Sequence, residues 1–215
     1  MAPHRVDCGQ MLHLSVNDLD NFTDQVVLVT GKSQAASANL KKDADTTSVG
    51  GSSGVGLEFI KILLSKNVRG VVLADPAPPS PEIADAKQLT YVKTDVTDWD
   101  SIQVPFEKAA EVYGTLDMVF ANAGVGEMEH LFVTEETGDG KLKAPKYKAM
   151  DINTYGIMNT IKLAVHWFRK LGKVKGQTDR PGRIVMTASI AGYETPGLPI
   201  YTASKVCDSL TRHHA

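Results

Sequence analysis

Short apolar runs alternate along the chain with segments of helical periodicity. The runs are rich in β-branched residues, and they comprise Gln25 to Thr30, Gly70 to Ala74, Leu89 to Val92, Leu116 to Ala121 and Arg183 to Thr187. Continuous apolar runs of this length are typical of strands that are covered on both faces of a parallel sheet. The sequence therefore predicts five buried, parallel strands.

Helical patterns fill the intervals between these runs. In the first interval the apolar residues recur at helical spacing, as Leu57, Ile60, Leu63 and Leu64. A second helix is expected over Ser101 to Tyr113, with Asp98 and Asp100 as candidates to cap its first turn. Alternation of strands with crossover helices predicts the α/β class and, within it, a single Rossmann-type doubly wound parallel sheet.

The longest helical pattern runs from Tyr147 to Leu171, and its apolar side chains spread around much of the helix. Such a helix needs more than one packing partner. Two interpretations stay open: a deeply buried crossover helix, or the interface of a homodimer or homotetramer. The preceding segment, Gly138 to Ala149, is expected to be a solvated loop whose lysines need no ligand.

Composition and charge indicate a globular domain that acts on a small molecule. The 215 residues are 42% hydrophobic and carry a formal net charge of -2, without a polybasic stretch for nucleic acid or a membrane surface. Two cysteines at opposite ends, Cys8 and Cys207, and histidines without metal-ligand spacing argue against a disulfide framework or a metal site. The N-terminus lacks the apolar core of a signal peptide, and no run approaches membrane-spanning length, so a cytoplasmic location is expected.

A glycine-rich turn suited to a pyrophosphate is present in two pieces. Thr30 and Gly31 end the first strand, and the second piece is Gly51, Ser52, Ser53, Gly54, Val55 and Gly56. With residues 32–50 set aside, the join reads TGGSSGVG, in which glycines let backbone amides approach a phosphate at a helix N-terminus. A P-loop at this place is excluded, because that motif needs a glycine where Val26 stands.

Two aspartates follow the second and third strands. Asp75 could accept both ribose hydroxyls of NAD and would repel a 2′-phosphate, which favours NAD and leaves NADP as the alternative. Otherwise Asp75 is a turn residue ahead of Pro76. Asp95, with Val96 beside it, could hydrogen-bond an adenine amino group or merely cap the next turn.

A pair of residues suited to proton transfer stands near the end of the sequence. Tyr201 and Lys205 are four residues apart, so on a helix they share one face and the ammonium can lie close to the phenol. A neighbouring cation stabilises a phenolate and makes a phenol a better acid or base near neutrality. Ser189 stands twelve positions before the tyrosine. Alone, the YxxxK spacing also fits the start of an ordinary amphipathic helix.

Together these motifs resemble those of the classical short-chain dehydrogenases/reductases. The matching features, in chain order, are the interrupted glycine turn, the aspartate after the second strand, Asn122, Ala123 and Gly124 after the fourth, Asn153, Ser189 and the Tyr201 and Lys205 pair. The segment that starts at Asn122 lies where open α/β sheets bind ligands, at the carboxyl end of a strand. The resemblance covers roughly residues 24–206 and is strongest to fungal members of the 15-hydroxyprostaglandin dehydrogenase-like branch.

The resemblance implies an enzyme that interconverts a secondary alcohol and a ketone with NAD or NADP. Tyr201 would exchange a proton with the substrate oxygen while hydride moves between the substrate carbon and the nicotinamide. Lys205 would stabilise the phenolate and bind the nicotinamide ribose, and Ser189 would hydrogen-bond the substrate oxygen. Asn153 would hold a water that links Lys205 to solvent. Alternatively, Ser189 is a strand-end hydroxyl, one residue nearer the tyrosine than is usual in the family, and Asn153 a buried amide that satisfies backbone.

The chain departs from the family at two places. Residues 32–50 hold only two larger aliphatic side chains, Leu40 and Val49, so this insert is expected to loop out. The family continues well beyond the position of Lys205, so the sheet is expected to lack the usual C-terminal strands. One hypothesis covers both departures: the chain translates an incompletely spliced message or a faulty gene model. The alternative is a genuine variant with a tolerated surface loop.

These expectations give one domain at 24–215 after an N-terminal extension at 1–23, with 32–50 as an inserted loop and 206–215 as an atypical tail. A second interpretation of the function, from a different class, is a non-catalytic remnant that binds a nucleotide or dimerises.

Overall fold

Five parallel strands form one sheet in the computed structural model, which describes residues 22–31, 54–127, 131–175, 182–194 and 197–211. The strands are β1 (Val26–Thr30), β2 (Gly70–Asp75), β3 (Leu89–Lys93), β4 (Met118–Ala121) and β5 (Arg183–Met186). The helices are α1 (Gly54–Ser65), α2 (Pro81–Ala84), α3 (Trp99–Tyr113), α4 (Lys148–Met150), the π-helix η2 (Asp151–Gly156), α5 (Ile157–Lys175), the 3-10 helix η3 (Ile190–Gly192) and α6 (Pro199–Thr211). The strand order is β3-β2-β1-β4-β5, which reverses beside β1 and confirms the predicted doubly wound α/β fold. Within the described ranges no strand follows β5.

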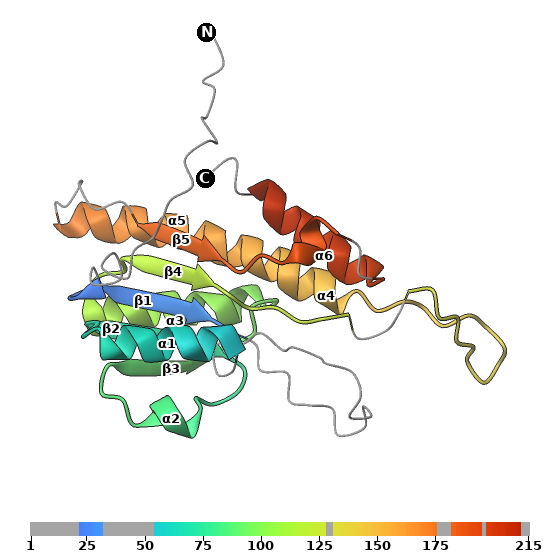
Figure 1. Ribbon diagram of the computed structural model, residues 1–215. Helices are drawn as coiled ribbons and strands as arrows, with labels where there is room; N and C mark the ends of the chain where they lie inside the picture. The colour runs from blue at the N-terminus through green and yellow to red at the C-terminus, as the bar shows by residue number, and fades with distance from the viewer. Residues whose placement is uncertain (1–21, 32–53, 128–130, 176–181, 195–196, 212–215) are drawn as a thin grey trace, which may run out of the picture.

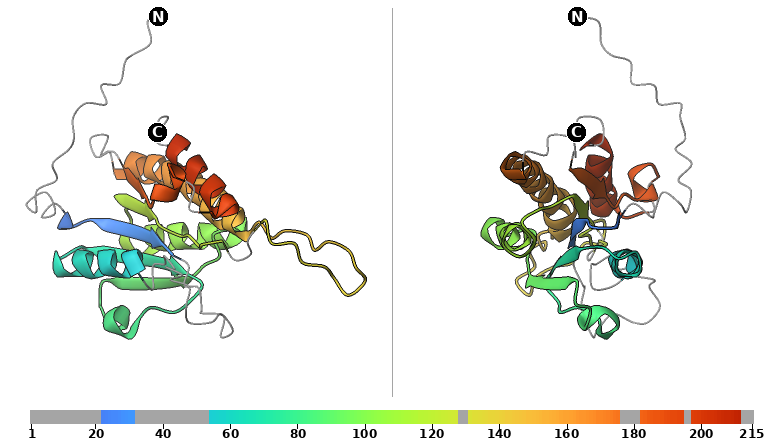
Figure 2. Two further views of the ribbon diagram at one scale, coloured as in Figure 1. Left: turned by 45° about the vertical axis from the view of Figure 1, so that its right-hand side comes forward. Right: turned by 90° about the vertical axis from the view of Figure 1, so that its left-hand side faces the viewer.

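Alternate side chains of β1 belong to two separate cores. Val27 and Val29 pack with α1 on one face of the sheet, whereas Val26 and Leu28 pack on the other face with α3 and α5. All four side chains are fully buried. Figures 1 and 2 show the same layers, with α1 on one side of the sheet and α3 and α5 on the other. Both faces of β1 are therefore covered, as its continuous apolar run predicted. The prediction of five buried strands holds for β1, β2 and β4 but is wrong for β3 and β5, which are only partly buried because they form the edges of the sheet.

The fourth strand begins at Met118, not at Leu116 as the apolar run suggested. Asp117 interrupts the run, because its carboxylate Oδ2 accepts a hydrogen bond from the Val26 N–H at 2.8 Å. Its own N–H donates to the Val26 carbonyl at 2.9 Å. Asp117 thus binds the first residue of β1 through both hydrogen bonds, and the regular pairing of β1 with β4 starts after it.

The start of α3 uses one of the two predicted caps. Asp98 accepts a hydrogen bond from the Ser101 N–H at 2.8 Å, and the helix begins at Trp99, ahead of the predicted start. Asp100 lies in the first turn, where a negative charge suits the helix dipole. Gly114, with a φ of 64°, ends the helix in the left-handed conformation.

The long helix near the middle of the chain consists of α4, η2 and α5 in succession. Its inner side is buried at Ile152, Ile157 and Leu163, which confirms a crossover helix packed on the sheet. Its outer side leaves Tyr155 60% and Met158 44% exposed. The interface between copies, the other interpretation of this helix, stays a prediction.

An arm formed by residues 131–147 leads into α4 and projects from the body of the molecule (Figure 1). Its two limbs meet at a backbone bridge between Glu136 and Leu142. Lys143 pairs with Glu135 at 2.8 Å, and this ammonium holds the pKa of the carboxyl below its usual range. The part of the arm predicted as a solvated loop is exposed throughout.

Candidate active site

The carboxyl ends of β1, β4 and β5 are joined by side-chain hydrogen bonds. Thr30 Oγ1 accepts the N–H groups of Asn122 at 3.1 Å and Ala123 at 3.4 Å. Thr187, just after β5, donates its hydroxyl to Asn122 Oδ1 at 2.7 Å. Among the described residues, Asn122 Nδ2 is buried and finds no acceptor. A buried amide donor without a partner is suited to a ligand at this edge of the sheet.

Lys205, Asn153 and Gly124 meet at the same edge. Lys205 is buried, its Nζ donates to the Thr187 carbonyl at 3.2 Å, and Nζ lies 5.9 Å from the centre of the Tyr201 ring. A Cβ placed on Gly124 would lie 3.5 Å from Asn153 Oδ1 and 3.8 Å from Lys205 Nζ. The absent side chain of Gly124 therefore leaves space beside both groups.

Asn153 uses its side-chain amide to bind protein groups. Its Oδ1 accepts the Val125 N–H at 2.9 Å, and its Nδ2 donates to the Val125 carbonyl and to Ser204 Oγ, both at 2.9 Å. The residue is fully buried within η2. These bonds match the alternative in which a buried amide forms hydrogen bonds with backbone groups. The water-holding role stays a prediction.

Ser189 lies at the start of η3, which packs against α6. Its Oγ accepts the Ala191 N–H at 3.2 Å, so the hydroxyl can still donate its own proton. A Cβ on Gly192 would lie 2.8 Å from the Lys205 carbonyl oxygen, which shows how closely η3 approaches the helix of Tyr201 and Lys205. This close packing brings the serine segment to that helix.

On the nucleotide side, α1 opens at Gly54 in the left-handed conformation, with a φ of 57°. The first turn of α1 holds no acidic residue, and Gly56 is buried while Val55 is exposed. A helix N-terminus of this kind favours a negatively charged group. Gly31, at the end of β1, donates its N–H to the Ala74 carbonyl at 2.8 Å. Ser52, Ser53 and the insert at 32–50 lie outside the described residues.

Asp75 is buried at the end of β2, and its Oδ1 accepts the Ala77 N–H at 2.9 Å. This bond is the one expected of a turn aspartate. A carboxylate offers about four acceptor positions, so the bond is compatible with a further contact to a ribose, which stays a prediction. Tyr91 donates its hydroxyl to the Asp75 carbonyl, and burial together with the Asp75 charge raises the pKa of Tyr91.

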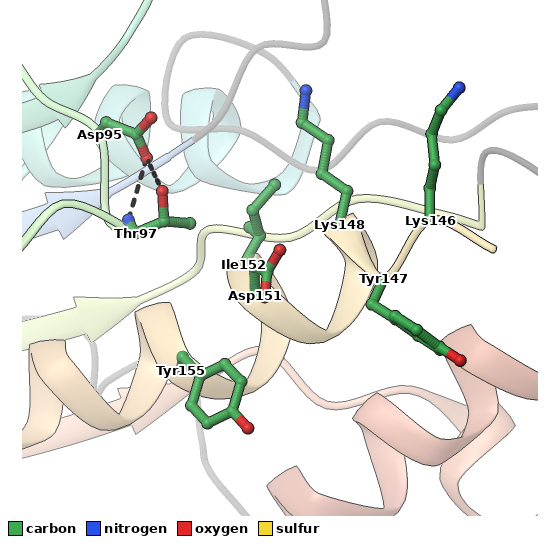
Figure 3. A pocket seen from close by; sticks show the side chains of 8 residues that line it. All are labelled: Asp95, Thr97, Lys146, Tyr147, Lys148, Asp151, Ile152 and Tyr155. Atoms are coloured by element: carbon green, nitrogen blue, oxygen red, sulfur yellow. Dashed lines mark hydrogen bonds between the residues drawn. The ribbon is translucent and has the colours of Figure 1, made fainter. Parts of the chain in front are cut away.

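Asp95 lies at the wall of an open pocket of about 770 Å³. Its Oδ1 accepts the Thr97 N–H at 2.9 Å and the Thr97 hydroxyl at 2.7 Å, as in the alternative of a turn cap. Figure 3 shows this turn on one side of the pocket and side chains of the α4 and η2 segment, such as Asp151 and Tyr155, on the other. Val96 is buried against Gly156, and the adenine contact predicted for this segment is untested.

Two residues make contacts at the site that the sequence did not predict. Glu127 Oε2 accepts the N–H groups of Ile200 at 2.9 Å and Tyr201 at 3.0 Å. Ser204 is fully buried and donates its hydroxyl to the Tyr201 carbonyl at 2.7 Å. The sequence indicates the role of Glu127 only indirectly. The first turn of α6 contains no acidic residue of its own, so a carboxylate that caps it has to come from elsewhere in the chain.

The part of the chain that the structure describes holds no cluster of side chains that could ligate a metal ion. Within the same described ranges, no helix has the length and apolar character needed to span a membrane.

Comparisons with known proteins agree with this geometry. The family model described as short chain dehydrogenase matches residues 47–214. Relatives include the short-chain dehydrogenase/reductase ascJ of Acremonium egyptiacum, 31% identical over 84% of this chain and 53% of the relative. Another is prx4 of Penicillium rubens, 36% identical over 73% of this chain and 44% of the relative. The chain thus spans about half the length of these curated relatives.

Solved structures show the same fold. A short chain dehydrogenase/reductase from Burkholderia phymatum in complex with NAD has a TM-score of 0.62 and 25% identity, over 89% of this chain and 59% of the other. A short-chain type dehydrogenase/reductase from Mycobacterium marinum has a TM-score of 0.65 at 19% identity, over 94% of this chain and 72% of the other. Fungal relatives are confirmed, whereas the 15-hydroxyprostaglandin dehydrogenase-like branch stays a prediction. Sequence, fold and site agree, and the chain belongs to the short-chain dehydrogenase/reductase family.

Proposed function

We propose that this protein is an NAD(P)-dependent oxidoreductase that interconverts a secondary alcohol and a ketone. The observation that supports this most is the convergence of Lys205 Nζ, Asn153 and Gly124 at the carboxyl edge of the sheet, beside Tyr201. Ligands of doubly wound folds bind at this edge. A relative named 5′-hydroxyaverantin dehydrogenase, from Dothistroma septosporum and 32% identical over 73% of this chain, agrees with a hydroxy compound as substrate.

The residues at the edge fit a nicotinamide dinucleotide. Gly54 at the N-terminus of α1 suits the pyrophosphate, Gly124 leaves space, and Asn122 Nδ2, which has no acceptor among the described residues, offers a donor. Asp75 at the end of β2 would accept the ribose hydroxyls, which favours NAD over NADP. The dinucleotide, when bound, supplies the nicotinamide ring that accepts or returns a hydride.

The chain's own residues would handle the proton and the charge on the substrate oxygen. Tyr201 would take the proton of the alcohol hydroxyl onto its phenolate oxygen, and return it in the reverse direction. The ammonium of Lys205 stabilises that phenolate through its positive charge in a buried setting. Ser189 would donate its hydroxyl proton to the substrate oxygen and stabilise the charge that develops there.

The test is a fluorescence titration with NADH and with NADPH, followed by oxidation of cyclohexanol, 2-octanol and 1-phenylethanol with NAD. It is run on the whole chain and on a variant that lacks residues 32–50, which we expect to bind NADH about tenfold more tightly because its glycine turn is continuous. Tighter binding of NADPH than NADH would contradict the role of Asp75. Binding without turnover in both proteins would favour a non-catalytic remnant, and no binding in either would contradict the proposal.

A further inference from the structure

We propose that Glu127 is a positioning residue. It holds the first turn of α6 and thereby fixes the position of Tyr201 beside the loop that follows β4. The proposal rests on the proposed function for the importance of Tyr201. Glu127 stands three residues after Gly124, in the loop that follows β4. It is thus part of the segment that would line the nicotinamide end of the site.

The contacts of Glu127 join two parts of the chain. Oε2 accepts the N–H groups of Ile200 and Tyr201 at 2.9 and 3.0 Å, and Oε1 accepts the Leu131 N–H at 3.3 Å. The N–H groups in the first turn of a helix have no partner within the helix. A carboxylate there forms charge-assisted hydrogen bonds and also interacts favourably with the helix dipole. Since α6 begins at Pro199 without an acidic residue in its first turn, Glu127 supplies the cap from a distant loop.

A second set of bonds holds the other side of the Tyr201 backbone. The Tyr201 carbonyl accepts the Ser204 hydroxyl at 2.7 Å, and Ser204 Oγ accepts from Asn153 Nδ2. Asn153 in turn binds both backbone groups of Val125, two residues before Glu127. The N–H and the carbonyl of Tyr201 are therefore both tied to the loop that follows Gly124, one through Glu127 and the other through Ser204 and Asn153.

This arrangement predicts which substitutions preserve the position of Tyr201. Glu127→Gln keeps a carbonyl oxygen that can accept both N–H groups, although it loses the charge. Glu127→Ala removes the acceptor altogether. Glu135→Ala is the matched control, because Glu135 lies on the exposed arm and its ion-pair partner is Lys143, not α6.

The first measurement is hydrogen exchange at the Ile200 and Tyr201 amides in the whole protein. In Glu127→Ala we expect both amides to exchange about tenfold faster, whereas Glu127→Gln and Glu135→Ala should stay within about threefold of the unmodified protein. Unchanged exchange in Glu127→Ala would overturn the proposal.

The second measurement separates positioning from general stability. With the alcohol of the panel that reacts fastest, Glu127→Ala should lower kcat about tenfold to a hundredfold while the Kd for NADH stays unchanged, and Glu127→Gln should restore most of the rate. A rise in KM at constant kcat would make Glu127 a substrate contact and overturn the positioning role. Equal losses of NADH binding and thermal stability would make it merely structural. If neither the unmodified protein nor the variant that lacks residues 32–50 oxidises any of the alcohols, the proposed function fails, and the exchange rates still decide whether Glu127 holds the helix.

Discussion

Tyr201 and Lys205 are four residues apart in the sequence, and this spacing brings the ammonium of one close to the ring of the other. The spacing predicts a shared helix face, and in the structure Lys205 is buried and its Nζ lies 5.9 Å from the centre of the tyrosine ring. The Thr187 carbonyl fixes the ammonium on the side of β5. The pair therefore lies at the edge where β4 and β5 end.

The phenol oxygen of Tyr201 is the group on which the proposed proton transfer depends. Tyr201→Phe removes that oxygen and keeps the ring, so we expect kcat to fall by about 10² to 10⁴ with little change in the Kd for NADH. Steady-state rates and a fluorescence titration check this. Tyr193→Phe is the matched control, because Tyr193 is 74% exposed and should tolerate the change. A Tyr201→Phe protein that keeps its full rate would contradict the assignment.

Residue types that carry chemistry could be predicted from the sequence, but their partners could not. Spacing identifies Tyr201 and Lys205, since four residues on a helix have a fixed geometry whatever the rest of the chain does. The bond from Ile200 to Glu127 spans 73 residues and depends on how the loop after β4 meets α6. Similarly, Asn153 was identified by resemblance, whereas its bonds to Val125 follow from the fold alone.

At the scale of elements, β1 and β2 were predictable because their apolar runs are covered on both faces. The order of the strands was not, since it is set by crossovers and not by the strands themselves. The π-helix η2 could not be predicted from the spacing of apolar residues either. It occupies Asp151–Gly156 within a longer helical pattern, and one local change of hydrogen bonding hardly alters the spacing of apolar residues.

Gly156 is the residue that lets the long helix pass close to the loop after β3. A Cβ at this position would lie 2.6 Å from Val96 Cγ2, and Val96 is buried and cannot move away freely. We expect Gly156→Ala to lower the free energy of unfolding by about 1–3 kcal/mol, more than alanine regains through helix propensity. Urea denaturation measures this.

Gly138→Ala is the control for that substitution, because a Cβ at Gly138 would meet none of the described residues within 4 Å. The control should stay within about 0.5 kcal/mol of the unmodified protein. If the two variants lose equal stability, the close approach of Gly156 to Val96 is not the cause.

At the scale of the whole molecule, one group of exposed apolar side chains lies on the outer side of the long helix, at Tyr147, Tyr155 and Met158. A pocket of about 550 Å³ lies there, and its lining includes Tyr147, Met150, Tyr155 and Ile200. An apolar surface that continues over two elements is typical of an interface between proteins. The predicted homodimer or homotetramer would cover it.

This prediction can be tested by placing charges on the exposed face. We expect the protein to sediment at a multiple of its chain mass, and the double substitution Tyr155→Glu with Met158→Glu to shift it to the mass of one chain, because a second copy would have to bury two unpaired carboxylates. The matched control is Val104→Glu with Val112→Glu on α3, where both valines are about half exposed on a different helix. Sedimentation velocity at micromolar concentration distinguishes the forms. Sedimentation of the unmodified protein as a single chain would show that the outer side of the long helix is a free surface, and the assembly through this helix would then be wrong.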